Sequence, residues 1–331
     1  MSNYRIFGAE LSPYSVKVRS YFRYKQIEHE WLLRSGHNAT EYQKYAKLPI
    51  IPLVVDPDGL AMQDSTPLMA AIEERFAEPS IHPTDPVCRF LSILLEEFGD
   101  EWGNKWMFHL RWAREEDYLS AAGRIAAMNV GVADEVVYLD VRQQVIERMR
   151  DRVFFVGSND RTAGQIETSF QSAIPQLEAH LSRFDFLFGG RPSLADFGLW
   201  GQVYCAWTDP TGAAWIQGQA PALLDWIHRM LWPRATGDWA DWQDLDATLS
   251  PFLRDQVGAL FLPWSRANAE ALQQGVAEFS VQLNGQEWVQ QPQKYHAKSL
   301  AVLLDAYAAV ADNEALNAVL NDAGCLPALQ V

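Results

Sequence analysis

The sequence predicts a chain of three parts: an α/β domain over residues 1–78, an all-α domain over residues 87–232 and a C-terminal α+β extension over residues 233–331. Three observations support this prediction. Strand-like and helix-like patterns alternate over roughly the first eighty residues, a proline-rich linker, AEPSIHPTDP, follows, and helical periodicity dominates the part after it. The chain of 331 residues exceeds one average domain, so more than one domain is expected.

The first part alternates in the order strand, helix, strand, short helix, strand, strand, helix. These elements are predicted from YRIFGA, SPYSVKVRSYFRYKQI, HEWLL, TEYQKYAK, IPLVVD, LAMQ and DSTPLMAAIEERF. The turn DPDG joins the last two strands, and Pro67 in the first turn favours the last helix. This order predicts an α/β sandwich whose parallel strands are connected by a right-handed crossover.

Helices account for the second part, and a hairpin interrupts the helices of the third. The helices of the second part are expected near residues 87–119, 134–152, 162–183, 194–207 and 220–231. In the extension, Asn284-Gly285 joins EFSVQL to QEWVQQ, and this pair favours a type I′ β-hairpin because both turn positions need positive φ. The extension is rich in apolar side chains, so it is expected to pack on the body, either over a cleft or at a dimer interface.

Composition excludes several classes of function. The net charge of −15 argues against nucleic acid and anionic membranes as partners, because both would repel this surface. The three cysteines are too far apart for a disulfide framework, no stretch approaches ~18 apolar residues and the N-terminus does not resemble a signal peptide, so a cytoplasmic protein is expected. No metal-ligand spacing occurs, and the acidic residues near Glu97 are better interpreted as a solvated face than as a metal site.

Ser12 is the first candidate for chemistry. It precedes Pro13, which is favourable at the first position of a helix, so Ser12 is predicted to be the N-cap. Free backbone N–H groups at a helix N-terminus stabilise an anion such as a thiolate. The alternative is that Ser12 is only a structural cap.

Two further motifs lie in the same domain. Pro52 stands directly before an apolar strand, where a cis Ile51-Pro52 bond would expose the backbone of Ile51 to an extended ligand. Asp64 and Ser65 open a helix, where they either cap it or present a carboxylate, a hydroxyl and free N–H groups to the head group of an amino acid.

With these motifs in this order, the chain resembles the glutathione transferase superfamily. SPYSVKVR is similar to the family's first-helix motif, IIPLVVDPDG to its cis-proline strand, QDSTPLMAAIEERF to its γ-glutamyl-binding turn and SLADFGLW to its helix-six capping motif. In the last, Ser193 and Asp196 form an S-x-x-D capping box. The resemblance covers about residues 3–232 and implies a thioredoxin-like first domain, the family's all-helical second domain and a homodimer.

The resemblance also implies roles for individual residues. Ser12 matches the position that interacts with the sulfur of glutathione, which makes it the expected catalytic residue, with Ser15 as the alternative donor. Ile51, beside Pro52, would pair through its backbone with the cysteinyl part of glutathione. Asp64 and Ser65 would hold the γ-glutamyl end, so glutathione is expected as a co-substrate and no metal is required.

A serine at position 12 favours one chemistry over another. A cysteine could exchange disulfides with glutathione, whereas a serine hydroxyl can donate to the glutathione thiolate and lower the pKa of that thiol. The expected reaction is therefore attack of the thiolate on an electrophilic carbon of a small molecule. The pocket for this second substrate is expected to involve Tyr14, Trp106, His109 and Arg111, although core packing is the alternative for aromatic residues at helical spacing.

One departure from the family pattern motivates a second hypothesis. Ile50 stands where the family often has a basic or amide side chain that contacts the peptide, and Lys47 or His37 would have to substitute for it. The alternative function is a binding or interaction protein that retains the fold but has a degraded glutathione site.

Overall fold

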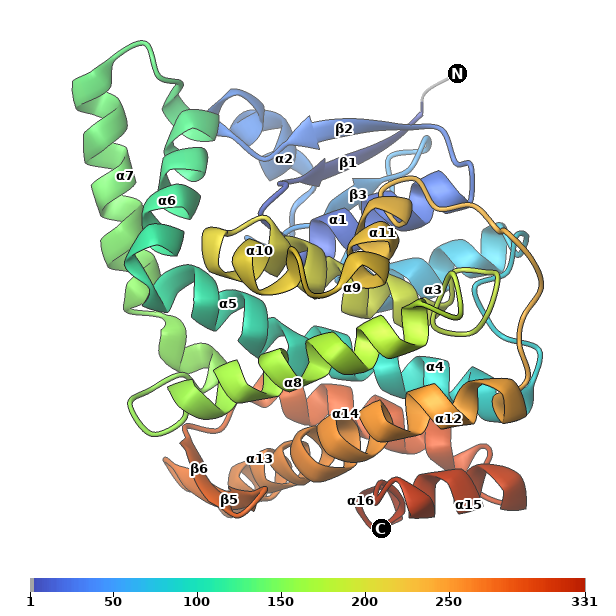
Figure 1. Cartoon of the computed structure of the whole chain (residues 1–331). Coiled ribbons are helices and arrows are strands. Elements are labelled where there is room, and N and C mark those ends of the chain that lie inside the picture. Colours follow the sequence, from blue (N-terminus) through green and yellow to red (C-terminus); the bar gives the residue numbers. More distant parts are fainter. Residues whose placement is uncertain (1–2, 331) are drawn as a thin grey trace.

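The computed structural model describes residues 3–330, and its first domain is built on a mixed four-stranded sheet (Figure 1). The strands are β1 (Tyr4–Gly8), β2 (His29–Leu33), β3 (Leu53–Val55) and β4 (Ala61–Gln63). They lie in the order β2-β1-β3-β4, with β1 and β2 parallel and the other neighbours antiparallel. Parallel neighbours need a crossover, and α1 (Pro13–Tyr24) supplies it between β1 and β2.

Helices cover both faces of this sheet because its strands alternate their side chains. Ile6 and Val54 belong to the main core, which includes α1 and α3 (Ser65–Arg75). Their neighbours Phe7 and Leu53 instead form a second cluster with Tyr42 of α2 (Ala39–Tyr45), which follows a short 3-10 turn. The α/β sandwich predicted from the sequence is therefore present.

The second domain is helical throughout. Its helices are α4 (Pro86–Phe98), α5 (Asn104–Ala113), α6 (Glu115–Val130), α7 (Glu135–Arg150), α8 (Ala163–Leu181), α9 (Leu194–Trp207), α10 (Pro210–Ile216) and α11 (Pro221–Arg229). The helix expected near residues 87–119 is divided, because a π-helical segment (Gly99–Gly103) joins α4 to α5 and the extended backbone of Arg114 ends α5. Helix α10 was not expected from the sequence, because residues 208–219 lie between two of the expected helices.

Helix α9 lies at the centre of the molecule and contacts α1 and α4 through glycines. A Cβ at Gly198 would lie 3.0 Å from the Cα of Glu96 on α4, and one at Gly201 would lie 2.7 Å from the carbonyl oxygen of Pro13 on α1. The backbones of α4 and α1 lie so close to these two glycines that no side chain fits at either position. Helix α9 thereby fixes the start of α1 against the helical domain.

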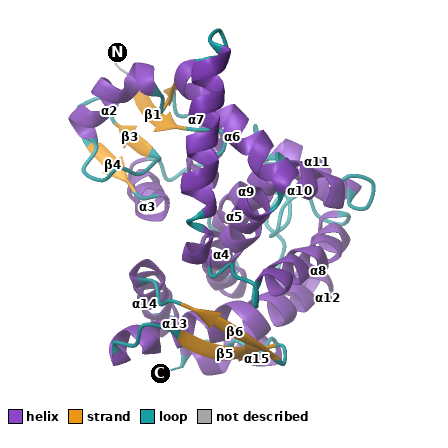
Figure 2. Ribbon diagram, turned by 90° about the vertical axis from the view of Figure 1, so that its left-hand side faces the viewer, coloured by secondary structure: helices purple, strands orange, loops and turns teal. Residues whose placement is uncertain are grey.

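The extension forms a third layer at the end of the molecule opposite the sheet (Figure 1, Figure 2). It consists of α12 (Trp242–Phe252), a π-helical segment (Leu253–Phe261), α13 (Leu262–Gln274), β5 (Phe279–Leu283), β6 (Gln286–Gln290), α14 (Lys294–Ala308), α15 (Glu314–Asp322) and α16 (Leu326–Leu329). The predicted hairpin is confirmed, because β5 and β6 are antiparallel and Asn284 and Gly285 both have positive φ. The extension shares the main core, with Trp264 and Trp288 packed against Trp102.

No helix between residues 3 and 330 has the length and apolar character needed to cross a membrane. All three cysteines are buried and unpaired.

Candidate functional site

Ser12 is the N-cap of α1, and its hydroxyl keeps a proton to donate. Ser12 Oγ accepts from the backbone N–H of Ser15 at 3.3 Å and from Ser15 Oγ at 2.9 Å. Within residues 3–330 no acceptor is recorded for the proton of the Ser12 hydroxyl, and the residue is half-buried, whereas Ser15 is fully buried. Ser12 can therefore cap the helix and still donate a hydrogen bond to a ligand, because the cap bond uses a lone pair of its oxygen and leaves the O–H available.

The Ile51-Pro52 bond is cis, as the sequence analysis proposed. Neither the N–H nor the C=O of Ile51 has a hydrogen-bond partner among the described residues, so both are available to an extended ligand. The loop before it is fixed by Gln63, whose side chain accepts from the N–H of Leu48 at 3.0 Å and donates to the carbonyl of Ile50 at 2.9 Å. Sequence reasoning assigned no role to Gln63, although it directly precedes the Asp64 motif.

The side chains that could compensate for Ile50 take no part in this arrangement. Ile50 itself is 43% exposed, and only its carbonyl is engaged, by Tyr42 and Gln63. Lys47 and His37 are exposed, and within the described part of the chain neither side chain has a recorded polar partner. The loop is therefore held by its backbone and presents an apolar side chain.

Asp64 occupies the N-cap position of α3, but its side chain makes no hydrogen bond to the helix. Its φ is 74°, a conformation that Asp tolerates better than most residues, and its carboxylate makes no capping bond. Asp64 Oδ1 instead accepts from the hydroxyl of Tyr295 on α14 at 3.1 Å. Ser65 is buried, and its hydroxyl has no recorded partner within residues 3–330. The start of α3 therefore offers backbone N–H groups, a hydroxyl and a carboxylate.

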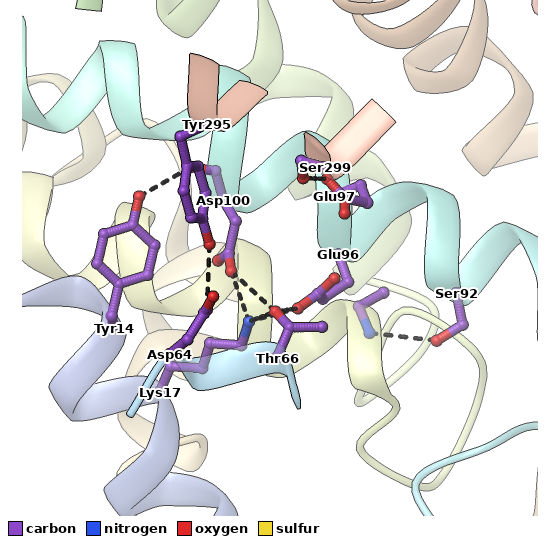
Figure 3. Close-up of polar contacts among 11 residues, drawn as sticks. Tyr14, Lys17, Asp64, Thr66, Ser92, Glu96, Glu97, Asp100, Tyr295 and Ser299 are labelled. Carbon is purple, nitrogen blue, oxygen red and sulfur yellow. Dashed lines mark hydrogen bonds and ion pairs between the residues drawn. The ribbon is translucent and has the colours of Figure 1, made fainter. Parts of the chain in front are cut away.

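A buried ionic cluster lies beside this helix start (Figure 3). Lys17 Nζ donates to Asp100 Oδ2 at 2.6 Å, to Thr66 Oγ1 at 3.2 Å and to Glu96. Burial opposes the charge of Lys17, but the adjacent Asp100 and Glu96 more than offset it and raise its pKa. Burial raises the pKa of Asp100 to about 7 despite Lys17, and Asp100 Oδ1 has no hydrogen-bond partner among the described residues.

The residues expected to line a second-substrate pocket do not gather in one place. Tyr14 lies near the cluster, where its hydroxyl donates to the carbonyl oxygen of Asp100 at 3.0 Å, and burial raises its pKa well above the usual value. Trp106 is buried, donates to Ser169 and stacks on Phe170. Trp106 therefore has the packing role that was the alternative for the aromatic residues.

His109 and Arg111 are also buried and bound by protein groups. His109 contacts Ser158 at 2.8 Å, and burial lowers its pKa. Arg111 donates to Asp209 Oδ2 and to the carbonyl oxygen of Leu11, both at 2.6 Å. Since Leu11 directly precedes Ser12, Arg111 acts on the loop that places the candidate serine instead of opening toward a ligand.

The extension reaches the same region through the N-terminal half of α14. Besides the contact between Tyr295 and Asp64, His296 contacts Glu101, and Ser299 donates to Glu97. Burial raises the pKa of Glu97 to about 8 and lowers that of His296 to about 4. Within residues 3–330 no group of three or more acidic, histidine or cysteine side chains is arranged to hold a metal ion.

Two family models match the chain. The glutathione S-transferase N-terminal domain matches residues 6–80, and the glutathione S-transferase C-terminal domain matches residues 143–229. Both matches end before the extension. The order of the two matched domains agrees with the resemblance identified from the motifs.

The chain is also similar to solved structures. The beta-etherase LigF from Sphingobium sp. strain SYK-6 is 19% identical, with 69% of this chain and 95% of that chain covered and a TM-score of 0.50. A glutathione S-transferase from Methylobacterium radiotolerans, in complex with glutathione sulfonate, is 18% identical, with 69% and 90% covered and a TM-score of 0.43. The Tau class glutathione S-transferase MiGSTU from mango, Mangifera indica, is 18% identical, with 69% and 88% covered and a TM-score of 0.42. A comparison with proteins of curated function finds no match.

The match to the beta-etherase shows a glutathione transferase fold: an N-terminal α/β domain with a mixed sheet, followed by a helical domain, to which this chain adds the extension with its β-hairpin.

Proposed function

We propose that this protein is a glutathione transferase-like enzyme in which Ser12 stabilises the thiolate of bound glutathione for attack on a small electrophile. One observation supports this function above the others: the Ser12 hydroxyl accepts two hydrogen bonds from Ser15 and keeps its own proton free at the N-terminus of α1. A thiolate beside that proton, at the positive end of the α1 helix dipole, is stabilised by both.

The surrounding groups suit a γ-glutamyl tripeptide in an extended conformation. The unpaired N–H and C=O of Ile51 can pair with the main chain of the cysteinyl residue, since a peptide adds to an exposed backbone in this way. Ser65 and the N–H groups at the start of α3 suit the α-carboxylate of the γ-glutamyl end, and Asp64 suits its ammonium group.

The reaction then requires little of the protein beyond activation and proximity. The glutathione sulfur forms a bond to the electrophilic carbon, and the electron pair of the broken bond leaves with the displaced group or stays on the acceptor. A hydrogen bond to a charged group contributes about 1.5–3 kcal/mol. Because one pKa unit corresponds to ~1.4 kcal/mol, Ser12 would lower the pKa of the thiol by about 1–2 units from its free value near 8.5.

A binding protein that does not catalyse conjugation is the second candidate. The exposed apolar side chain of Ile50 favours it, because the peptide would lose a polar contact at that position. Such a protein would have a degraded glutathione site and would not retain glutathione at millimolar concentration.

The test measures glutathione binding and the ultraviolet absorbance of the bound thiolate in the wild type, Ser12→Ala and Ser12→Thr. The wild type is expected to bind glutathione and to show a depressed thiol pKa, which Ser12→Ala raises by about 1–2 units and Ser12→Thr retains. Equal thiolate fractions in all three proteins would remove Ser12 from the mechanism even if glutathione binds. No binding by the wild type at millimolar glutathione would overturn the proposed enzyme and favour the second candidate.

A homodimer and a cytoplasmic location are further parts of the proposal. Light scattering after size exclusion and fractionation of the source cells test them.

A further inference from the structure

We propose that Tyr295 of the extension is a positioning residue for the γ-glutamyl ammonium group, because its hydroxyl fixes the carboxylate of Asp64 beside that of Asp100. The inference rests on the proposed function. It assigns the extension, which lies outside both family matches, a part in ligand recognition.

The contact joins two residues 231 positions apart in the chain. The hydroxyl of Tyr295 donates to Asp64 Oδ1 at 3.1 Å. Asp64 occupies the N-cap of α3, where an aspartate ordinarily accepts from its own helix, yet here no capping bond is made. The carboxylate is therefore oriented by α14 and not by the helix that it precedes.

Helix α14 is fixed well enough to orient a side chain. His296 and Ser299 bind Glu101 and Glu97 on the neighbouring helical segment, and Leu300 and Leu303 are buried in the core. These contacts hold the first turn of α14 against the helical domain. Tyr295 itself is 56% exposed, and its hydroxyl reaches Asp64 from this fixed helix.

The charges near Tyr295 suit a primary ammonium group. Partial burial and the negative charges of Asp64 and Asp100 raise the pKa of Tyr295, so its hydroxyl stays protonated and donates. Lys17 engages Asp100 Oδ2, which leaves Asp100 Oδ1 buried without a partner. Such an oxygen is costly unless a donor reaches it, and an ammonium group carries three N–H donors.

Figure 3 shows these groups together, with the Tyr295 hydroxyl pointing toward the Asp64 carboxylate and Lys17 reaching the Asp100 carboxylate. Asp64 comes from the first domain, Asp100 from the second and Tyr295 from the extension. The ammonium subsite is therefore complete only when all three parts of the chain are present.

The test compares the binding of glutathione with that of its analogue lacking the α-amino group, glutaryl-cysteinylglycine. It uses the wild type, Tyr295→Phe and a matched control, Tyr307→Phe, which removes a hydroxyl on the same helix that donates to Asn317 within the extension. Calorimetry is expected to show that the wild type prefers glutathione, and that Tyr295→Phe reduces this preference about tenfold, which corresponds to ~1.4 kcal/mol. Tyr307→Phe is expected to keep the wild-type preference.

A purely structural role would weaken both ligands equally in Tyr295→Phe, and that result would overturn the inference. Unchanged or tighter glutathione binding by Tyr295→Phe would also overturn it, while the proposed function would stand. No glutathione binding by the wild type would overturn both together. Over half of Tyr295 is exposed, so the phenylalanine variant is expected to fold, and its thermal unfolding checks this directly.

Discussion

Lys17 Nζ lies 2.6 Å from Asp100 Oδ2, and this lysine of α1 is fully buried against the first helices of the second domain. Glu96 is a second buried partner of the same nitrogen. One cation thus compensates two carboxylates on the neighbouring domain, and the cluster lies beside the helix start that carries Asp64. The charge balance of the domain interface depends on this single lysine.

Lys17→Met is therefore expected to destabilise the protein by about 3–5 kcal/mol, because it leaves buried carboxylates without a counter-charge. Urea unfolding followed by tryptophan fluorescence measures the change. Lys44→Met is the control, since Lys44 pairs with Glu41 at the surface and its removal should leave the midpoint nearly unchanged. Similar midpoints for the two variants would contradict a structural role of the cluster.

Glu97 is expected to make stability depend on pH. Burial and the neighbouring Glu96 raise its pKa from 4.5 to about 8, so between these values the folded state holds a proton that the unfolded state has lost. The free energy of unfolding therefore falls as pH rises through this window, by up to ~1.4 kcal/mol per pH unit. Glu97→Gln should reduce this slope, because an amide does not titrate and can still accept from Ser299, while Asp100, whose pKa is also raised, keeps a slope of the same sign.

Urea unfolding at several pH values between 5 and 8 measures both slopes. Glu270→Gln on α13 is the matched control, because that side chain is exposed and has no recorded polar partner within residues 3–330. If the wild type and Glu97→Gln show parallel curves, the buried carboxyl does not titrate in this range.

Ser12→Cys is expected to change the chemistry of the site. The introduced thiol would lie at the N-terminus of α1, where a thiolate is stabilised. It could attack a mixed disulfide of glutathione, release the other thiol and then be freed by a second glutathione, which leaves as oxidised glutathione. A gain of glutathione-dependent disulfide reduction, with loss of conjugation, is therefore predicted.

A coupled assay of oxidised glutathione measures this gain. The native cysteines are all buried, and Ser182→Cys at the exposed end of α8 controls for the effect of an added surface thiol. Equal rates in the two variants would show that position 12 offers a thiol no special environment.

The capping box at the start of α9 is expected to contribute to stability. Ser193 Oγ accepts from the N–H of Asp196 and donates to its Oδ2 at 2.7 Å, while Asp196 Oδ1 accepts from the indole of Trp226 at 2.9 Å. Ser193→Ala removes the cap from a buried helix end and should cost about 1–2 kcal/mol in the free energy of unfolding. Ser182→Ala, at an exposed helix end, should cost much less, and equal losses would argue against the cap.

Local chemistry made much of this structure predictable. The cis Ile51-Pro52 bond followed from a proline before an apolar strand, the hairpin from Asn284-Gly285 and the capping box from Ser193 and Asp196. In each case the residues that form the feature are neighbours in the sequence. The same is true of Ser12 as a helix cap.

Features that depend on distant residues were not predictable. The contact between Tyr295 and Asp64 requires the extension to fold back over the body, and no pattern near either residue signals it. The directions of the Trp106 and Arg111 side chains were hard to predict for a different reason. The π-helical segment Gly99–Gly103 precedes them, and its wider turn changes which face of the helix later residues occupy, so helical spacing alone does not predict their direction.

The backbone contact between Gly201 and Pro13 has a consequence for how this protein could diversify. A methyl group at Gly201 would push the carbonyl of Pro13 and move the Ser12 hydroxyl with it, although the substitution lies in the interior of the second domain. Moving the Ser12 hydroxyl would thus require α1 and α9 to separate. Residues of α14 are free of that constraint, so new ligand preferences could arise there while the reacting sulfur stays where it is.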